Sequence, residues 1–206
     1  MTGLPVLAVP RDRRCWARSL DNGLRRRWAP ASVEVDLLEP LEGAGVVDLG
    51  AGTGYYVREI GRRIGPSGWI WLVDIDGENL EIARQRLPGD PRVRISVGSA
   101  SQAREIPSEC ADRVLMSLVL CCLYEKGGAL SEAWRVLRPG GRLLATFPRA
   151  FRWFGVRRRS LGMTPGLWKA LLLQHPWREV PVRSGWFIER HLLEKPRTPE
   201  DARALG

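Results

Sequence analysis

A glycine-rich turn directly after an apolar stretch constrains this chain more than any other feature. The stretch runs from Val46 to Gly54 with the sequence VVDLGAGTG. Glycines at alternate positions (Gly50, Gly52 and Gly54) let the backbone approach a ligand closely, because no Cβ stands in the way. The helix expected after the turn offers free N–H groups and a partial positive charge. The stretch therefore predicts a nucleotide-type site at the end of the first strand of an α/β sheet.

Two common nucleotide motifs do not fit this turn. The dinucleotide pattern G-x-G-x-x-G fails in both registers, because Tyr55 or Val57 stands where its last glycine is required. No Gly-Lys-Ser or Gly-Lys-Thr follows the turn, which excludes a phosphate loop of the nucleoside triphosphatase type.

Further segments extend the pattern along the chain. They read WLVDID at 71–76, VGSA at 97–100, SLVLCCL at 117–123 and RVLRPGGRL at 135–143. With the G-x-G-x-G turn and the acid two positions before it, they resemble the motifs of class I S-adenosylmethionine-dependent methyltransferases over about residues 16–148. The resemblance implies a Rossmann-like α/β fold with a seven-stranded sheet, mostly parallel with an antiparallel edge, and helices on both faces. It also implies an enzyme that uses S-adenosyl-L-methionine as its cofactor.

The resemblance assigns residues to the cofactor site. Asp74 at the end of the second strand is expected to bind the ribose hydroxyls and is favoured over Asp76, because its register matches the family. Ser99 stands where the family usually has an acid near the adenine. Asp48 either reaches the ammonium group or only orients the turn. The full set expected to bind the cofactor is Asp48, Gly50, Ala51, Gly52, Thr53, Gly54, Asp74, Ile75, Gly98, Ser99, Ala100, Ser117 and Leu118.

No residue is assigned to catalysis. Methyl transfer needs alignment and a dry site, and it needs a general base only if the acceptor loses a proton. His175 and His191 lie outside the motifs and are interpreted as surface residues. Cys121 and Cys122 stand where many family members carry histidines and are interpreted as packing residues. The cysteines lack metal-ligand spacing, so no metal is expected.

Length and composition favour a single domain over residues 1–206, and the resemblance implies that it is a methyltransferase domain. The chain is 44% hydrophobic and has no apolar run of the roughly 18 residues that a membrane span requires. No signal peptide is recognised, and a cytoplasmic location is the simplest interpretation. We expect a basic N-terminal arm or lid at 1–30, a cofactor-binding core at 31–148 and a variable acceptor-side region at 149–206.

Hydrophobic periodicity predicts the elements that surround the motifs. A helix is expected from Ser32 as its N-cap, with Val33, Leu37, Leu38 and Leu41 facing inward. The other helices are predicted at 79–87, 128–137 and 165–173, and the strands at 69–73, 93–97, 113–118, 142–147, 180–183 and 187–193.

The net charge of +9 is unevenly distributed and bears on the methyl acceptor. Residues 11–28 and 149–159 each carry a net charge of +5. These clusters favour a small acceptor that is anionic or amphiphilic. The alternative is an RNA- or tRNA-modifying methyltransferase in which the arginines hold phosphates. A set of tryptophans in the C-terminal third, Trp153, Trp168, Trp177 and Trp186, suggests a large apolar acceptor cavity.

Overall fold

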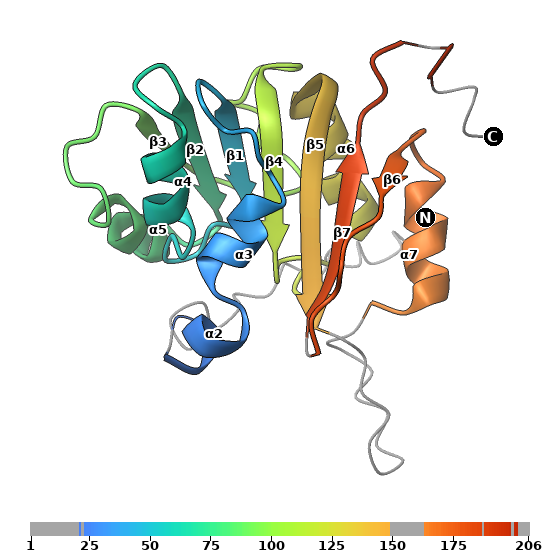
Figure 1. Cartoon of the computed structure of the whole chain (residues 1–206), viewed down its shortest axis with the longest axis horizontal. Helices are drawn as coiled ribbons and strands as arrows, with labels where there is room; N and C mark the ends of the chain where they lie inside the picture. The colour runs from blue at the N-terminus through green and yellow to red at the C-terminus, as the bar shows by residue number, and fades with distance from the viewer. Residues whose placement is uncertain (1–20, 22, 149–162, 187, 199, 202–206) are drawn as a thin grey trace, which may run out of the picture.

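A computed structural model describes residues 21, 23–148, 163–186, 188–198, 200 and 201. Strands and helices alternate along most of the chain (Figure 1). The strands are β1 (Gly45–Leu49), β2 (Trp69–Asp74), β3 (Val93–Val97), β4 (Ala111–Ser117), β5 (Leu137–Pro148), β6 (Arg178–Val180) and β7 (Ile188–Glu194). The helices are α2 (Gly23–Trp28), α3 (Ala31–Asp36), α4 (Val57–Arg63), α5 (Gly77–Arg84), α6 (Lys126–Val136) and α7 (Pro165–Leu172).

The strands of the described part of the chain form one sheet in the order β3-β2-β1-β4-β5-β7-β6. Strands β1 to β5 pair in parallel, whereas β7 runs antiparallel to both β5 and β6. The strand order changes direction between β1 and β4, and α/β sheets typically bind ligands at the carboxyl ends of the strands at such a point. The predicted fold class, mostly parallel with an antiparallel edge, is confirmed.

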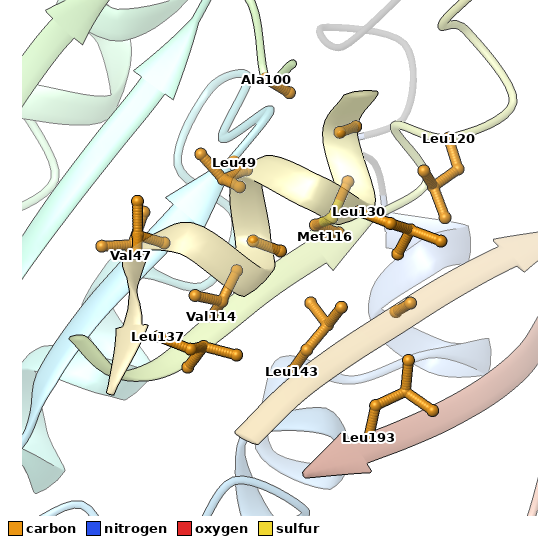
Figure 2. Packing of buried hydrophobic residues seen from close by; sticks show 14 of the residues in the cluster. Val47, Leu49, Ala100, Val114, Met116, Leu120, Leu130, Leu137, Leu143 and Leu193 are labelled. Carbon is orange, nitrogen blue, oxygen red and sulfur yellow. The ribbon is translucent and has the colours of Figure 1, made fainter. Parts of the chain in front are cut away.

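Two apolar layers cover the sheet. On one face α3, α4 and α5 pack against residues of β1, β2, β4 and β5. On the other face α6 and α7 pack against alternate residues of the same strands, and α6 lies behind the sheet in Figure 1. Figure 2 shows Val47, Val114, Leu143 and Leu193 from four strands gathered with Leu130 of α6. Strand β1 is buried along its whole length, as expected for a strand covered on both faces.

The segment before β1 differs from the prediction. Helix α3 is only six residues long and has Pro30 at its N-cap, so Ser32 lies inside the helix. Val33 is 42% exposed, whereas Glu34 is 1% exposed. Glu34 faces inward because its carboxylate has a buried hydrogen-bond partner, Tyr56.

The turn before β5 also differs. The strand was expected from residue 142, but β5 begins at Leu137 and includes Pro139, Gly140 and Gly141. A register shift against β4 accommodates this stretch, and Gly140 has φ +79°. The Pro-Gly-Gly sequence is therefore an irregularity within a long strand.

The C-terminal tryptophans do not share one environment. Trp168 and Trp177 are buried within the apolar core, whereas Trp186 is 75% exposed. Trp153 lies outside the described residues. The prediction that Trp168 and Trp177 line a cavity is therefore wrong, because both fill the space between α6, α7 and the sheet.

No helix among the described residues has the length and apolar character to cross a membrane.

Candidate functional site

The glycine turn lies at the carboxyl end of β1, where the sheet order changes direction. The N–H groups of Gly50 and Ala51 donate to the carbonyl oxygen of Val73 at 2.7 and 2.9 Å, which joins the turn to β2. The three glycines have positive φ values of +86° (Gly50), +52° (Gly52) and +73° (Gly54). Such values strain a residue that carries a Cβ, so the backbone path itself requires glycine.

Two of these glycines are also required for packing. A Cβ added at Gly50 would lie 2.4 Å from Cγ2 of Val119, in the segment that follows β4. A Cβ added at Gly54 would lie 2.7 Å from Cβ of Ala83 in α5. The turn therefore fits tightly between the β4 end and α5, which brings Ser117 and Leu118 close to the glycine turn.

The Asp74 carboxylate closes the turn from the side of β2. Its Oδ2 accepts a hydrogen bond from the N–H of Gly52 at 2.8 Å, and its Oδ1 accepts one from the N–H of Asp76 at 2.9 Å. Burial raises the pKa of Asp74, while these N–H donors act against the rise. Asp76 is the N-cap residue of α5, and its Oδ1 accepts a hydrogen bond from the N–H of Glu78 at 3.0 Å.

Asp74→Ala should weaken binding of S-adenosylhomocysteine by about 1–3 kcal/mol, the value of a lost charge-assisted hydrogen-bond pair. Asp76→Ala is the matched control and should weaken binding of S-adenosylhomocysteine much less, because the Asp76 carboxylate caps a helix. Isothermal titration calorimetry on both variants gives the ranking. A larger loss for Asp76→Ala would show that the assignment of the two carboxylates is reversed.

Asp48 supplies a second carboxylate beneath the turn. It is 1% exposed, and its Oδ2 has no hydrogen-bond partner among the described residues. Burial and the neighbouring Asp74 raise the pKa of Asp48 to about 7, against the influence of Arg25. A buried oxygen without a partner, next to another carboxylate, suits a cationic ligand. These residues therefore fit S-adenosylmethionine, which carries an ammonium and a sulfonium group.

The predicted adenine loop follows β3 and is tied to the end of β2. The N–H of Gly98 donates to the carbonyl oxygen of Asp74 at 2.9 Å. Oγ of Ser99 lies 2.8 Å from Oγ of Ser101, and Ala100 is 3% exposed. Ile75 follows directly after Asp74 at the same edge. The predicted ribose and adenine residues are therefore joined at the carboxyl edges of β2 and β3.

The end of β4 forms the opposite wall. The N–H of Leu118 donates to the carbonyl oxygen of Thr146 at 2.9 Å. Leu118 has φ +57°, an uncommon value for a branched side chain. Backbone strain of this kind is concentrated at ligand sites.

Comparison with known proteins agrees with this geometry. Residues 47–145 match a family model described as a methyltransferase domain. Those residues form a methyltransferase domain. The resemblance found in the motifs is thereby confirmed, and the chain has the fold of class I S-adenosylmethionine-dependent methyltransferases.

The relatives of the domain are also methyltransferases. A ubiquinone/menaquinone biosynthesis C-methyltransferase UbiE from Bordetella parapertussis is 35% identical over 122 residues, which are 59% of this chain and 46% of that protein. The chain thus spans about half the length of the curated relatives that it matches. A SAM dependent methyltransferase from Aquifex aeolicus has a TM-score of 0.74 at 19% identity, covering 86% of this chain and 96% of its own. A putative methyltransferase solved in complex with the Haloferax volcanii Trm112 methyltransferase activator has the same TM-score at 18% identity, covering 88% and 94%.

A buried polar network that the motifs did not reveal lies beside the methyltransferase domain's glycine turn. The Tyr56 hydroxyl donates to the Glu34 carboxylate and lies 2.7 Å from Oγ of Ser117. Ser117 in turn lies 2.9 Å from Oγ1 of Thr146. Burial raises the pKa of Glu34 and also that of Tyr56. The network therefore links the β4 end to a buried carboxyl group with an elevated proton affinity.

Two arginines complete the network. Nη2 of Arg25 donates to the Tyr56 hydroxyl at 3.0 Å and to Oγ of Ser117 at 3.2 Å. The Arg25 guanidinium also lies 4.0 Å from the centre of the Tyr55 ring. Arg190 of β7 pairs with Glu34 at 3.5 Å from within the fold. Isolated hydroxyls within apolar strands, such as Ser117 and Thr146, were the available signal in the sequence.

The segment that contains Asp21 and α2 holds the glycine turn from outside. Oγ1 of Thr53 donates to Oδ2 of Asp21 at 3.2 Å, and Nε of Arg86 donates to the Thr53 carbonyl oxygen at 2.5 Å. Burial acts to raise the pKa of Asp21, but its ion pair with Arg86 holds it below the usual value. In Figure 1, α2 lies beyond the carboxyl ends of the parallel strands.

The remaining sequence candidates lie elsewhere. His175 stacks on Trp134 with ring centres 4.9 Å apart, and His191 stacks on Phe147 at 5.1 Å. Both imidazoles therefore pack against aromatic rings. The cluster at 149–159 and most of the cluster at 11–28 lie outside the described residues.

Proposed function

We propose that the protein transfers the methyl group of S-adenosylmethionine to a carbon atom of a small anionic acceptor, such as a phenolate or an enolate. The observation that carries the cofactor assignment is a pair of neighbouring carboxylates at the turn: Asp48, which is buried, and Asp74, which is partly buried and accepts a hydrogen bond from the N–H of Gly52. The similarity to UbiE C-methyltransferases over 122 residues favours carbon as the site of methylation.

The cofactor, when bound, supplies a methyl group on a sulfonium centre, which needs no activation by the protein. The protein must then hold the acceptor carbon in line and exclude water. Replacing hydrogen by methyl on carbon also releases a proton. A ketone loses it before the transfer, when the enolate forms, and a phenolate loses it from the ring carbon after the transfer, when the ring becomes aromatic again. In both cases a C-methyltransferase needs a proton acceptor.

The buried network suits this proton transfer. The Ser117 hydroxyl, at the β4 end, takes the proton of the acceptor and passes its own to Tyr56. Tyr56 already donates to Glu34, so its proton moves to that carboxylate. Arg25 and Arg190 place positive charge around the network, which favours an anionic acceptor.

The chain is proposed to be organised around this site in three parts. Residues 1–30 form an arm or lid, and Asp21 and Arg25 are its described contacts with the turn and the network. Residues 31–148 form the cofactor-binding core, and residues 149–206 supply the acceptor side.

The test is a screen with a labelled methyl donor. Purified protein is incubated with methyl-labelled S-adenosylmethionine and a panel of phenols, quinols and enolisable ketones, and a tRNA pool forms a separate arm. The proposal predicts label on carbon, detected by nuclear magnetic resonance of the product. Label only on oxygen or nitrogen would contradict C-methylation, and label only on tRNA would favour the RNA alternative.

Glu34→Gln should lower kcat by about 10²–10⁴-fold, the typical contribution of a positioned base, with little change in KM. Tyr56→Phe should have a similar effect, because it breaks the relay without changing the ring. The control is Glu39→Gln, which removes a 43% exposed carboxylate from the loop that follows α3. Affinity for S-adenosylhomocysteine should stay near that of the wild type in all three variants. Wild-type turnover by Glu34→Gln at every pH would remove Glu34 from the mechanism.

A further inference from the structure

A row of charged side chains crosses the sheet at the edge opposite the cofactor site. Arg113 of β4 lies opposite Arg142 of β5 in the parallel ladder. Arg142 lies opposite Glu194 of β7, and Glu194 lies opposite Arg178 of β6. Four adjacent strands thus present three arginines and one glutamate side by side. Like charges on directly neighbouring strands destabilise a sheet unless a counter-charge offsets them.

The protein offsets only part of this charge. Glu194 pairs with Arg142 at 3.1 Å and with Arg178 in a shorter contact. Arg113 is 8% exposed. Its described hydrogen bonds are all donated to backbone carbonyl oxygens, those of Leu38, Asp112 and Pro40. Burial lowers the pKa of Arg113, and the neighbouring Arg142 lowers it further. Arg113 therefore places a positive charge at the base of the row. Its described hydrogen-bond partners are carbonyl oxygens, and the nearby carboxylates of Asp112 and Glu194 offset part of its charge.

The row forms one side of a cleft of about 700 Å³. Two more arginines line it, Arg138, which pairs with Asp112, and Arg197. Gly140 makes room for Arg197, because a Cβ there would lie 2.9 Å from Nε of that arginine. The complete lining is Pro40, Arg113, Arg138, Gly140, Arg142, Arg178, Glu194, Pro196, Arg197 and Asp201. Five arginines thus converge on one hollow against two lining carboxylates.

This cleft is separate from the cofactor site. Arg113 and Arg142 form one pair of the β4–β5 ladder, and Ser117 and Thr146 form another four residues along both strands. At about 3.3 Å per residue, roughly 13 Å of sheet separates the cleft from the polar network. The residues that line the cleft include members of β4, β5 and β7 at the edge where β4 and β5 begin and β7 ends, and these strand ends lie at the top of Figure 1.

We propose that this cleft binds a compact oligophosphate, a chain of two or three linked phosphates, either free or as the phosphate tail of a nucleotide. A planar guanidinium group can donate two parallel hydrogen bonds to two oxygens of one phosphate. A cleft of this volume is typical of sites that bind small ligands. The arginines converge on one hollow, which suits a compact anion, whereas an RNA backbone needs charges spread along a track. The described lining residues include no aromatic ring on which a nucleotide base could stack, and the arginines are expected to bind phosphate oxygens. The affinity should therefore depend on the number of phosphates in the ligand and not on the identity of the base.

The test titrates the full chain with phosphate, pyrophosphate, tripolyphosphate, ATP, GTP and single-stranded RNA by calorimetry. Affinity should increase with phosphate number, and ATP and GTP should agree within about threefold. Arg178→Ser with Arg197→Ser should weaken tripolyphosphate binding by about tenfold or more. Arg197→Ser alone should give a smaller loss in the same direction, and it leaves the Glu194 pairs intact.

The matched control is Arg62→Ser with Arg84→Ser, which removes two arginines that are 74% and 60% exposed on α4 and α5. This control should retain wild-type affinity for tripolyphosphate. Tripolyphosphate should also leave the affinity for S-adenosylhomocysteine unchanged, so the result does not depend on methyl transfer. An equal loss in the control pair, competition with S-adenosylhomocysteine or tighter binding of RNA than of tripolyphosphate would each overturn the proposal.

Discussion

Replacing Gly52 by valine is expected to abolish binding of S-adenosylhomocysteine while the fold survives. Gly52 has φ +52°, a conformation that a β-branched residue rarely adopts, and its N–H holds the Asp74 carboxylate in place. A shift of this peptide would displace both the turn and the Asp74 carboxylate, which is proposed to bind the ribose. We expect affinity to fall by at least about a hundredfold, or about 2.7 kcal/mol, in calorimetric titrations.

Gly89→Val provides the matched control. Gly89 has φ +71° and no atom within 4 Å of an added Cβ, and it lies in the loop between α5 and β3. The substitution therefore introduces comparable backbone strain away from the turn and should leave cofactor affinity unchanged. Circular dichroism should report a folded protein for both variants. Cofactor affinity of Gly52→Val within about threefold of the wild type would mean that the turn does not hold the ligand.

Asp48→Asn should stabilise the protein without ligand at high pH and weaken its cofactor binding. The pKa of Asp48 is raised from 3.8 to about 7 by burial and by Asp74. A carboxyl group with a raised pKa stabilises the fold at low pH, and that stability is lost as the pH rises through about 7. Removing the ionisable group should therefore increase the free energy of unfolding at pH 8 by roughly 2–4 kcal/mol and change it little at pH 4.

The affinity of the wild type for the cofactor should increase with pH, whereas its stability without ligand decreases. The ionised Asp48 favours a cationic ligand, so wild-type affinity should fall by up to about tenfold per pH unit below pH 7. The asparagine variant should bind weakly, and its affinity should not follow this titration. Asp36→Asn, at a 60% exposed carboxylate, controls for a change of charge. A variant that is destabilised at pH 8 and retains full affinity would show that Asp48 only supports the turn.

The fold was predictable because its signals are local. Each motif combines a strand with the turn or helix that follows it, and the order of the motifs along the chain resembles that of the family, which implied the seven-stranded sheet. Right-handed crossovers between parallel strands then account for helices on both faces. The Gly50–Gly54 turn, Asp74 and the 97–100 loop all lie at the carboxyl ends of parallel strands. Parallel strands end at one edge, so the predicted cofactor residues lie together there. Asp76 was separable from Asp74 by register, and its helix-capping role agrees with that choice.

The buried network was not predictable, because its residues are distant in the sequence. Glu34 and Tyr56 are 22 residues apart, and Tyr56 and Ser117 are 61 residues apart. Periodicity assigned the inward face of α3 to Val33, since a charged residue is normally placed in water. The positions of Tyr56 and Arg190 explain why Glu34 is buried instead. The arginine row was not predictable for a similar reason, because neighbours on adjacent strands depend on the register of the sheet rather than on sequence spacing.

The most direct test of the account is a calorimetric titration of the purified full chain with S-adenosylmethionine, S-adenosylhomocysteine and NAD. The account predicts one-to-one binding of both methionine-derived ligands, loss of that binding in Gly52→Val, and no binding of NAD. Tight binding of NAD with no response to S-adenosylmethionine or S-adenosylhomocysteine would contradict the central claim.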